Sequence, residues 1–369
     1  MLFQTEALVD LAAVGANTAL MAAMTRAEVM AVVKADAYGH GLVPSARAAL
    51  EGGATWIGVA TLDEARAIRR AGITAPTLAW LHTTGQDFAE AVTAEVDLSV
   101  SSLAQLEEVT EAARGTGHLA RLHLKVDTGL SRAGALPEDW PRLLDAAAKV
   151  QANGHAEIIG VWSHLARADE PDADSNAAQL LAFLEALDAA DAAGVHPPLR
   201  HLANTPGLLA APETHFDLVR PGLGLFGLSP FAGRDHGLRP AMTLRAKVAL
   251  VKRVPAGTSV SYGHTYTTSE TTTLALVPLG YGDGVPRAAS GLGPVDINGR
   301  RFTVAGRICM DQFVVDVGDH PVAEGDVATL FGPEGPSADD WAEVTGTINY
   351  EIVSRIAPRV PRRHIGGTT

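Results

Sequence analysis

The chain has 369 residues, a formal net charge of −13, and 47% hydrophobic against 19% charged residues. This composition is typical of a globular protein, and the length exceeds that of a single hydrophobic core, so two domains are expected. The acidic balance argues against nucleic acid as a partner, because phosphate binding needs clustered positive charge. One cysteine cannot form an internal disulfide, which favours a reducing compartment. Neither a signal peptide nor an apolar membrane span is expected from the sequence.

The first two thirds of the chain alternate short β-branched runs with alanine-rich helical segments. The helical segments include 62–71, 102–113, 137–152 and 175–193, where apolar residues recur at spacings of three and four. Such alternation predicts βαβ units and a parallel sheet. The number of units, and the lack of a GxGxxG segment after the first strand, favour an α/β fold of the (β/α)8 TIM-barrel type over a doubly wound sheet. The eight predicted strands are 30–34, 56–60, 77–81, 97–100, 120–126, 157–162, 199–203 and 217–220.

From about residue 236 the pattern changes to strands and turns. Alternating runs occupy 242–254, 271–280, 295–308, 313–318 and 326–332, and the pair Asn298-Gly299 predicts a type I′ hairpin. Two short helices are expected near 338–344 and 350–356. The sequence therefore predicts a barrel over 1–235 and a mainly β C-terminal domain over 236–369, with residues 1–13 pairing with the second domain.

Charged residues stand where several predicted barrel strands end, and a barrel carries its active site at that end. Lys34 ends the first strand, Lys125 the fifth and Arg220 the eighth, while His164 follows the sixth. Glycine-bearing turns follow strands seven and eight, where barrels commonly bind phosphate through backbone N–H groups. The sequence thus predicts a phosphate-binding site that contains two amines.

A lysine at a strand end beside a phosphate site indicates pyridoxal 5'-phosphate, whose aldehyde reacts with an amine. The apolar run before Lys34 would desolvate its amine and lower its pKa. Taken singly, each residue also has a structural interpretation. Lys34 could be a surface lysine, His164 a hydrogen-bonded structural histidine, and Arg220 an ion-paired strand end.

Nine segments, in order between about residues 5 and 364, resemble the alanine racemase family. The first, AVVKADAYGHG, is similar to the family's pyridoxal-phosphate attachment segment. The others are LHLKVDTGLSRAG, WSHLARADE, HLANTPG, FDLVRPGLGLFG, VSYGHTYT, LGYGDGVPR, GRICMDQ and TINYEIVSRIAPRVPR. The family's fold is a cofactor-binding barrel followed by a β domain, which is the architecture predicted above.

The resemblance implies a two-base racemisation of alanine. Lys34 would bind the cofactor covalently and then exchange a proton on one face of the substrate Cα, with Tyr262 on the other face. A tyrosine ordinarily titrates near pH 10, and in this family a histidine, here His164, lowers that value. Arg220 would hydrogen-bond the cofactor's pyridine nitrogen in place of the carboxylate that most such enzymes use.

Further positions follow from the same resemblance. Arg132 would contact the cofactor's phenolic oxygen and the substrate carboxylate. Lys125 would be carbamylated by CO2, giving an anion that orients Arg132. Asn204 would hold the loop beside the phosphate, and no metal is expected. The phosphate contacts would be Tyr38, Thr205, Gly222, Leu223 and Tyr350.

In this family the facing tyrosine comes from the partner subunit of a homodimer, so the active site is composite. Tyr281 and Met310 would also come from the partner and shape the entrance, with Asp311 near the substrate carboxylate. The structural alternatives are a turn tyrosine for Tyr281 and a core residue for Met310. Cys309 is interpreted as a small buried hydrophobe.

Some positions depart from the family pattern: Thr205 replaces a frequent serine, and Ala133, Arg167 and Gly282 also differ. These changes bear on substrate breadth. The competing functions are a broad-specificity amino-acid racemase, a decarboxylase on the same fold, and a non-catalytic pyridoxal-phosphate carrier. A role in supplying D-alanine for peptidoglycan would place the protein in a bacterial cytoplasm.

Overall fold

The computed structural model describes residues 3–231, 233–234 and 236–367. Eight strands pair in parallel in the order β8-β7-β6-β5-β4-β3-β2-β9. In β3 and β5 every residue is buried, as expected for parallel strands covered on both faces. The strands are β2 (Glu28–Val32), β3 (Trp56–Val59), β4 (Thr77–Ala79), β5 (Asp97–Val100), β6 (Ala120–Lys125), β7 (Ala156–Trp162), β8 (Leu199–His201) and β9 (Leu218–Val219).

Backbone hydrogen bonds between the β8 and β9 segments nearly close this sheet into a barrel. The N–H of Asp217 donates to the carbonyl of Arg200 at 3.1 Å, and the N–H of Arg220 donates to the carbonyl of Ala203 at 2.9 Å. The predicted (β/α)8 barrel is confirmed, and the doubly wound alternative is wrong.

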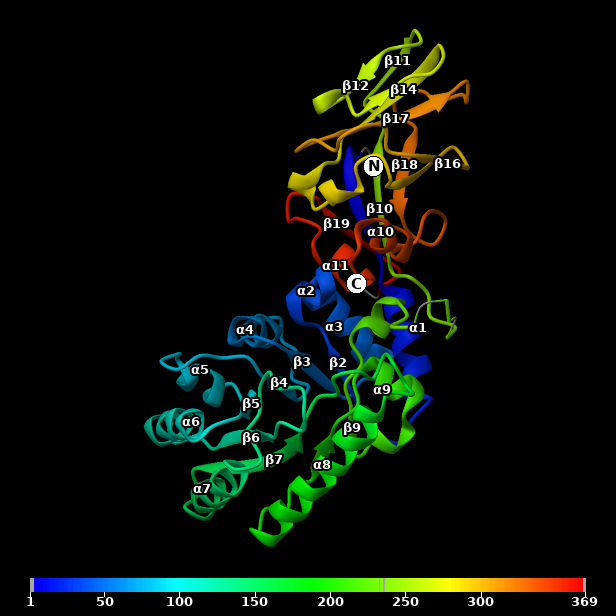
Figure 1. The fold of residues 1–369 in the computed structure, drawn as a ribbon. Coiled ribbons are helices and arrows are strands. Elements are labelled where there is room, and N and C mark those ends of the chain that lie inside the picture. Colours follow the sequence, from blue (N-terminus) through cyan, green and yellow to red (C-terminus); the bar gives the residue numbers. More distant parts are fainter. Residues whose placement is uncertain (1–2, 232, 235, 368–369) are drawn as a thin grey trace.

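Helices follow the barrel strands and lie outside them (Figure 1). At the start of α4, Thr61 and Glu64 form a reciprocal capping box, which satisfies N–H groups that lack an intrahelical acceptor. In the described part of the chain no helix is long and apolar enough to cross a membrane. The barrel helices are α1 (Leu11–Ala22), α2 (Lys34–Gly39), α3 (Leu42–Glu51), α4 (Leu62–Arg70), α5 (Phe88–Thr93), α6 (Leu103–Thr116), α7 (Trp140–Ala152), α8 (Asp174–Ala192) and α9 (Thr205–Ala210).

The rest of the chain is mainly β. A six-stranded sheet has the order β16-β15-β18-β10-β1-β19, and a three-stranded sheet has the order β11-β14-β17. The first strand, β1 (Thr5–Asp10), lies between β10 and β19. The remaining elements are β10 (Met242–Lys247), β11 (Leu250–Val254), β12 (Ser259–Val260), β13 (Tyr266–Thr267), β14 (Thr272–Val277), β15 (Pro294–Ile297), β16 (Arg300–Thr303), β17 (Phe313–Gly318), β18 (Val327–Phe331), α10 (Ala338–Thr345), α11 (Asn349–Ser354) and β19 (Arg362–Ile365).

The predicted hairpin joins β15 to β16. Asn298 and Gly299 have φ values of 49° and 74°, and both central residues of a type I′ turn require positive φ. The short pair β12–β13 lies in a segment for which no strand was predicted. The expected boundary after residue 235 falls on a residue outside the described part of the chain.

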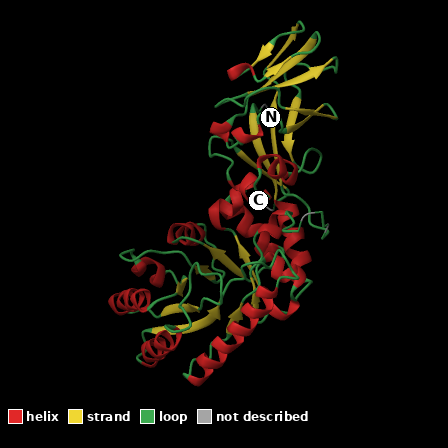
Figure 2. Cartoon of the chain, in the orientation of Figure 1, coloured by secondary structure: helices red, strands yellow, loops and turns green. Residues whose placement is uncertain are grey.

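The molecule is elongated, with the barrel at one end and the β-rich region at the other (Figure 2). The barrel and its helices enclose one hydrophobic core, and the β-rich region encloses a second. Helix α2 of the barrel and α11 of the β-rich region lie side by side where the two meet (Figure 1). Tyr38 packs against both cores, so the first barrel loop links them.

Candidate active site

A cavity of about 500 Å³ lies at the carboxyl end of the barrel strands. The structure brings together here most of the residues that the sequence singled out. Trp80 and Trp162 add apolar walls to the same cavity. The predicted residues in its lining are Lys34, Tyr38, Lys125, Arg132, His164, Asn204, Thr205, Arg220, Gly222, Leu223 and Tyr350.

The sequence predicted that Lys34 ends the first barrel strand, but in the structure Lys34 is the first residue of α2. Strand β2 stops at Val32, and the four residues Ala35 to Tyr38 form a left-handed turn with φ between 53° and 55°. For non-glycine residues this conformation costs roughly 1–2 kcal/mol each. The surrounding structure must therefore hold the turn that carries Lys34.

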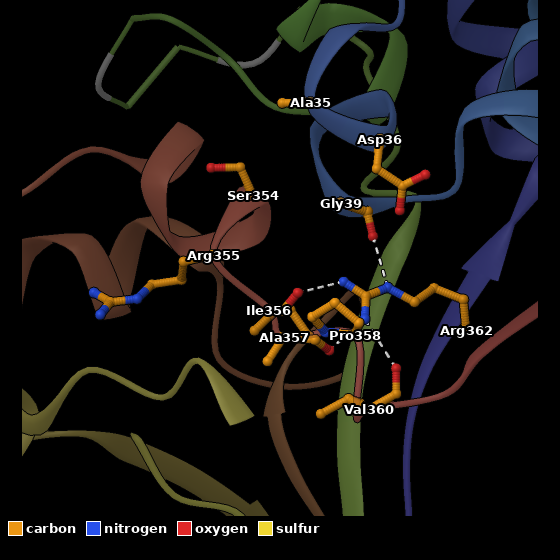
Figure 3. A pocket seen from close by; sticks show the side chains of 10 residues that line it. All are labelled: Ala35, Asp36, Gly39, Ser354, Arg355, Ile356, Ala357, Pro358, Val360 and Arg362. Carbon is orange, nitrogen blue, oxygen red and sulfur yellow. Dashed lines mark hydrogen bonds between the residues drawn. The ribbon is translucent and has the colours of Figure 1, made fainter. Parts of the chain in front are cut away.

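Side chains from two distant parts of the chain, Glu64 and Arg362, hold this turn. The N–H of Ala35 donates to Glu64 Oε1 at 2.6 Å. On the other side, Arg362 of β19 donates from Nε to the carbonyl of Gly39 at 3.0 Å and from Nη1 to the carbonyl of Ala357 at 2.6 Å. Figure 3 shows this guanidinium between α2 and the C-terminal segment, beside a second cavity of about 580 Å³. The strained turn is thus fixed by both halves of the molecule.

The two amines in the cavity are both shifted toward their neutral forms. Burial, and next the charge of Arg132, lower the pKa of Lys34. Burial, followed by the charges of Arg220 and Arg132, lowers the pKa of Lys125 to about 7. The Lys125 ammonium also lies 4.2 Å from the centre of the Trp162 ring. A neutral amine is the nucleophilic form, so both lysines are prepared to react with an electrophilic carbon.

Arg220 is held rigidly in the cavity wall. Its Nη2 donates to the carbonyl of Ser163 at 2.8 Å and lies 3.3 Å from Nδ1 of His164, and its Nη1 lies 3.1 Å from Nδ1 of His201. Burial lowers the pKa of Arg220 to about 9, so it stays charged at neutral pH. Burial, and next Arg220, hold the pKa of His164 well below its usual range, so His164 is neutral.

Hydroxyl and backbone groups line another part of the cavity. Thr205 Oγ1 accepts a hydrogen bond from the N–H of Gly222 at 2.9 Å, and Asn204 Oδ1 accepts one from the N–H of Gly207 at 3.1 Å at the start of α9. A Cβ on Gly222 would lie 2.3 Å from the hydroxyl of Tyr38. Glycine at this position therefore makes room for the phenol of Tyr38. Hydroxyl groups and backbone N–H groups together form a set of hydrogen-bond donors that suits a phosphate.

Tyr262, Tyr281, Met310 and Asp311 are absent from this cavity lining among the described residues. Tyr262 is 71% exposed, Met310 53% and Tyr281 41%. Their segments are bound to one another. The N–H of Tyr281 donates to the carbonyl of Cys309 at 3.0 Å, and the hydroxyl of Ser261, next to Tyr262, donates to the carbonyl of Arg307 at 2.6 Å. Asp311 pairs with Arg359 at 2.9 Å. We call these four residues the exposed cluster. Because Met310 is exposed, its interpretation as a core residue is wrong.

Sequence reasoning missed several residues that support the site. Gln179 of α8 donates to the carbonyl of His164 at 3.0 Å, and Glu64 anchors the turn after Lys34. Asp97, His123 and His201 lie inside the barrel behind Arg220. The last three carried a signal, because a charged or imidazole side chain inside an apolar barrel strand needs a buried partner. Among the described residues no group of three or more His, Cys, Asp or Glu is placed to hold a metal ion.

This geometry defines an enzyme of the (β/α)8-barrel class, with its site at the strand ends and a β-rich region beside it. The comparisons give the family. The model of the alanine racemase N-terminal domain matches residues 9–230, and that of the alanine racemase C-terminal domain matches residues 241–364. The chain belongs to the alanine racemase family and is therefore an isomerase of the racemase type.

Relatives match over nearly the whole chain. An alanine racemase from Salinispora tropica is 59% identical, with 99% of both chains covered. Among solved structures, alanine racemase from D-cycloserine-producing Streptomyces lavendulae has a TM-score of 0.98 and 52% identity, covering 100% of this chain and 98% of that one. Alanine racemase from Bacillus anthracis with bound L-Ala-P has a TM-score of 0.91 and 36% identity, covering 99% and 96%.

Proposed function

We propose that this protein interconverts L-alanine and D-alanine with pyridoxal 5'-phosphate as its cofactor. The observation that carries the proposal is the meeting of Lys34, Arg220 and the Thr205–Gly222 hydrogen bond in one cavity of a chain of this family. The Bacillus anthracis relative with bound L-Ala-P supports an alanine-like ligand for the same fold. We also propose the division into a barrel domain over 1–235, of which residues 1–13 pair with the second domain, and a β domain over 236–369.

The cavity suits this cofactor at both ends. Lys34 offers a partly buried amine with a lowered pKa, as an aldehyde requires. At the other end, the phosphate would be held by the hydroxyls of Tyr38, Thr205 and Tyr350 and by the N–H groups of Gly222 and Leu223. Arg220 faces the same cavity, and its Nε has no hydrogen-bond acceptor among the described residues. It is free to donate to a ring nitrogen.

Pyridoxal phosphate supplies an aldehyde for the amine and a conjugated ring that acidifies the substrate Cα–H bond. This chain would supply the bases and the orientation. Lys34 takes or returns the Cα proton on one face, and Tyr262 does so on the other. His164 is neutral, and because its Nδ1 faces the donating guanidinium of Arg220, its proton lies on Nε2, which can donate to the oxygen of Tyr262. Arg132, exposed at the cavity rim, binds the substrate carboxylate.

Because Tyr262 lies outside the cavity of its own chain, the proposal includes a homodimer with composite sites. In Figure 1, β12, which directly precedes Tyr262, lies toward the far end of the β-rich region from the barrel. Three of the four residues of the exposed cluster, Tyr262, Tyr281 and Met310, are aromatic or apolar, and exposed groups of such residues commonly mark interfaces. A two-fold dimer would place each exposed cluster, with Tyr281, Met310 and Asp311, over its partner's cavity.

Lys125 is the remaining group of the proposal, as a carbamylated lysine. Only a neutral amine reacts with CO2, forming an N–C bond and releasing one proton. The pKa of Lys125, lowered to about 7, leaves much of it neutral at physiological pH. The resulting anion would replace a like-charge contact with Arg132 by an attractive one. An intact mass without added CO2, together with a bare ammonium in electron density, would refute it.

The test of the function is to incubate holoenzyme with L-alanine and to measure D-alanine by coupled oxidation, and then to reverse the direction. We expect racemisation in both directions. Cofactor binding without D-alanine would favour the carrier, and loss of CO2 would favour the decarboxylase. A panel of other amino acids separates an alanine racemase from a broad-specificity one. We also propose that the protein supplies D-alanine for peptidoglycan in the cytoplasm.

A further inference from the structure

A continuous chain of buried hydrogen bonds runs from the cavity wall into the barrel. Nη1 of Arg220 lies 3.1 Å from Nδ1 of His201. Nε2 of His201 lies 2.9 Å from Nδ1 of His123, and Nε2 of His123 lies 3.0 Å from Oδ2 of Asp97. Arg220 is nearly buried and the other three residues are fully buried. We call Asp97, His123 and His201 the relay.

The Arg220 guanidinium and the Asp97 carboxylate stand at the two ends of this hydrogen-bonded series, and together they determine which ring nitrogen of each histidine carries a proton. A guanidinium can only donate, so His201 Nδ1 must accept. Burial, and next the charge of Arg220, hold the pKa of His201 well below its usual range, so His201 is neutral and carries its single proton on Nε2. That proton is donated to His123 Nδ1, which must in turn be bare. His123 then donates from Nε2 to the carboxylate of Asp97, so both imidazoles are Nε2–H tautomers.

The barrel around the relay is shaped to contain it. A Cβ on Gly160 of β7 would lie 2.5 Å from Nδ1 of His123, the atom that accepts from His201. The Trp162 ring stacks on His201 with a centroid distance of 5.4 Å, and Trp56 meets His123 edge-on at 5.6 Å. These contacts hold both imidazoles in place. Gly160 therefore leaves space for His123, and Trp162 and Trp56 pack against the two imidazole rings of the relay.

We propose that the relay positions Arg220 for the racemase reaction: Asp97 sets the tautomers of His123 and His201, so that His201 presents an acceptor that fixes the Arg220 guanidinium toward the cavity. The part that concerns the reaction rests on the proposed function. The part that concerns the tautomers does not, because it follows from the hydrogen bonds alone. None of the three relay residues touches the cavity, so they are positioning residues rather than catalytic ones.

Asp97→Asn should reverse the direction of every hydrogen bond between the side chains of the relay and switch both histidine tautomers. Arg121 donates from Nε to Asp97 Oδ1 at 2.6 Å, so it would retain the amide oxygen of the asparagine. The amide NH2 would then face His123 Nε2, which must become an acceptor. The proton moves to His123 Nδ1, His201 Nε2 becomes an acceptor, and a proton on His201 Nδ1 meets the N–H of Arg220. Two donors would face each other, and Nη1 of Arg220 would lose His201 as its acceptor, while Nη2 keeps the carbonyls of Ser163 and Leu202.

Two further variants separate the polarity of the relay from simple damage. Arg121→Ala keeps the carboxylate and should keep both Nε2–H tautomers. In Asp97→Asn combined with Arg121→Ala, the amide is free to turn its oxygen toward His123, and both Nε2–H tautomers should return. Asp217→Asn is the matched control, because it breaks an Asp–Arg pair with Arg200 of 2.7 Å outside the relay.

The experiment is ¹⁵N NMR of histidine-labelled holoenzyme, in which the two ring nitrogens of each tautomer have distinct shifts. The signals of His123 and His201 are identified among those of the 13 histidines by their loss in His123→Gln and His201→Gln. Wild type should show Nε2–H at both sites and Asp97→Asn should show Nδ1–H, with turnover lower by about tenfold or more. Recovery of tautomers and turnover in the double variant supports the proposal.

Three results would overturn the relay. They are a wild-type proton on Nδ1 of either histidine, a pair of unchanged tautomers in a folded Asp97→Asn protein, and changed tautomers with wild-type turnover. If Asp97→Asn does not fold, the wild-type spectrum and the double variant still decide. Failure of the proposed function gives a different result, namely no D-alanine from wild-type protein whose tautomers are as expected.

Discussion

The cavity at the barrel mouth and the exposed cluster on the β-rich region are two sets of predicted site residues with opposite surroundings. In the cavity, Arg220 is bonded on several sides and Lys34 is held by an anchored turn. In the exposed cluster, Tyr262 and Met310 point mostly to solvent. The difference teaches that a single chain pre-organises the part of the site proposed to hold the cofactor but leaves Tyr262, the proposed second base, outside that cavity.

The largest effect should come from the cavity, through Lys34→Ala. Loss of the amine removes both the covalent attachment and one proton carrier, so racemisation should fall by about ten-thousand-fold. The measurement is D-alanine formation together with absorbance of the bound cofactor. Lys149→Ala, an exposed lysine near the end of α7, is the control and should leave both unchanged. Substantial racemisation by Lys34→Ala would remove Lys34 from its assigned role.

The next effect should come from the exposed cluster, through Tyr262→Phe. Losing the phenol removes one of two bases, which should lower turnover by about a hundred- to ten-thousand-fold while the cofactor stays bound. Tyr266→Phe is the matched control. Tyr266 donates to Asp316 at 2.7 Å, so this variant should lose about 1 kcal/mol of stability but little activity.

Mixing the two inactive variants would test the comparison directly. If the sites are composite, a mixed dimer of Lys34→Ala and Tyr262→Phe chains carries one intact site and one doubly defective site. Activity should reappear after the chains are unfolded together and refolded. If each site is contained in one chain, the mixture stays as inactive as its components, and the dimer proposal fails.

A smaller effect is expected at the phosphate end of the cavity. Gly222→Ala places a methyl group 2.3 Å from the present position of the Tyr38 hydroxyl. Overpacking of this kind costs about 1–3 kcal/mol, so cofactor affinity should fall by roughly ten- to a hundred-fold. Gly115→Ala in α6, where no atom lies within 4 Å of the new Cβ, is the control. Equal cofactor affinity in both variants, measured by titration, would contradict the assignment.

The last expected effect is on stability rather than on activity: a pH dependence of unfolding that arises from Lys125. Its folded pKa of about 7 lies well below the ordinary lysine pKa of about 10.4. The unfolded chain therefore binds an extra proton between these values, so stability rises with pH from about 7 to about 10, by up to ~1.4 kcal/mol per pH unit. Below pH 7 both states are protonated and this slope ends.

Lys125→Met should remove that contribution to the slope. The comparison is denaturant unfolding of both proteins across this pH range in CO2-free buffer, with Lys149→Met as the control. Identical slopes in wild type and Lys125→Met would show that the folded amine titrates like an exposed one, and the basis for carbamylation would be lost.

The sequence predicted the barrel well because its strands are short, apolar and separated by helical segments. The run at 97–100 coincides with β5, and 313–318 coincides with β17. Most of the predicted cofactor residues meet in one cavity, because parallel strands bring their carboxyl ends to the same edge. Local sequence patterns were therefore sufficient to predict those features of the fold that depend on the order of the strands and on the spacing of apolar residues.

The sequence did not predict the left-handed turn from Ala35 to Tyr38 or the pair β12–β13. Four consecutive non-glycine residues with positive φ contradict local propensity. They are stabilised by Glu64 and by Arg362, which lies more than 300 residues away. Strands of two residues have too few side chains to show a period.

By itself, the sequence determined the barrel, the β-rich region, the family, and the residue types at the strand ends. Only the tertiary structure decided which groups are neutral, which are fixed, and which are left exposed. The lowered pKa of Lys125, the orientation of Arg220 and the protons of the relay depend on burial and on contacts between distant segments. These quantities depend on distance and dielectric, which a linear pattern does not contain.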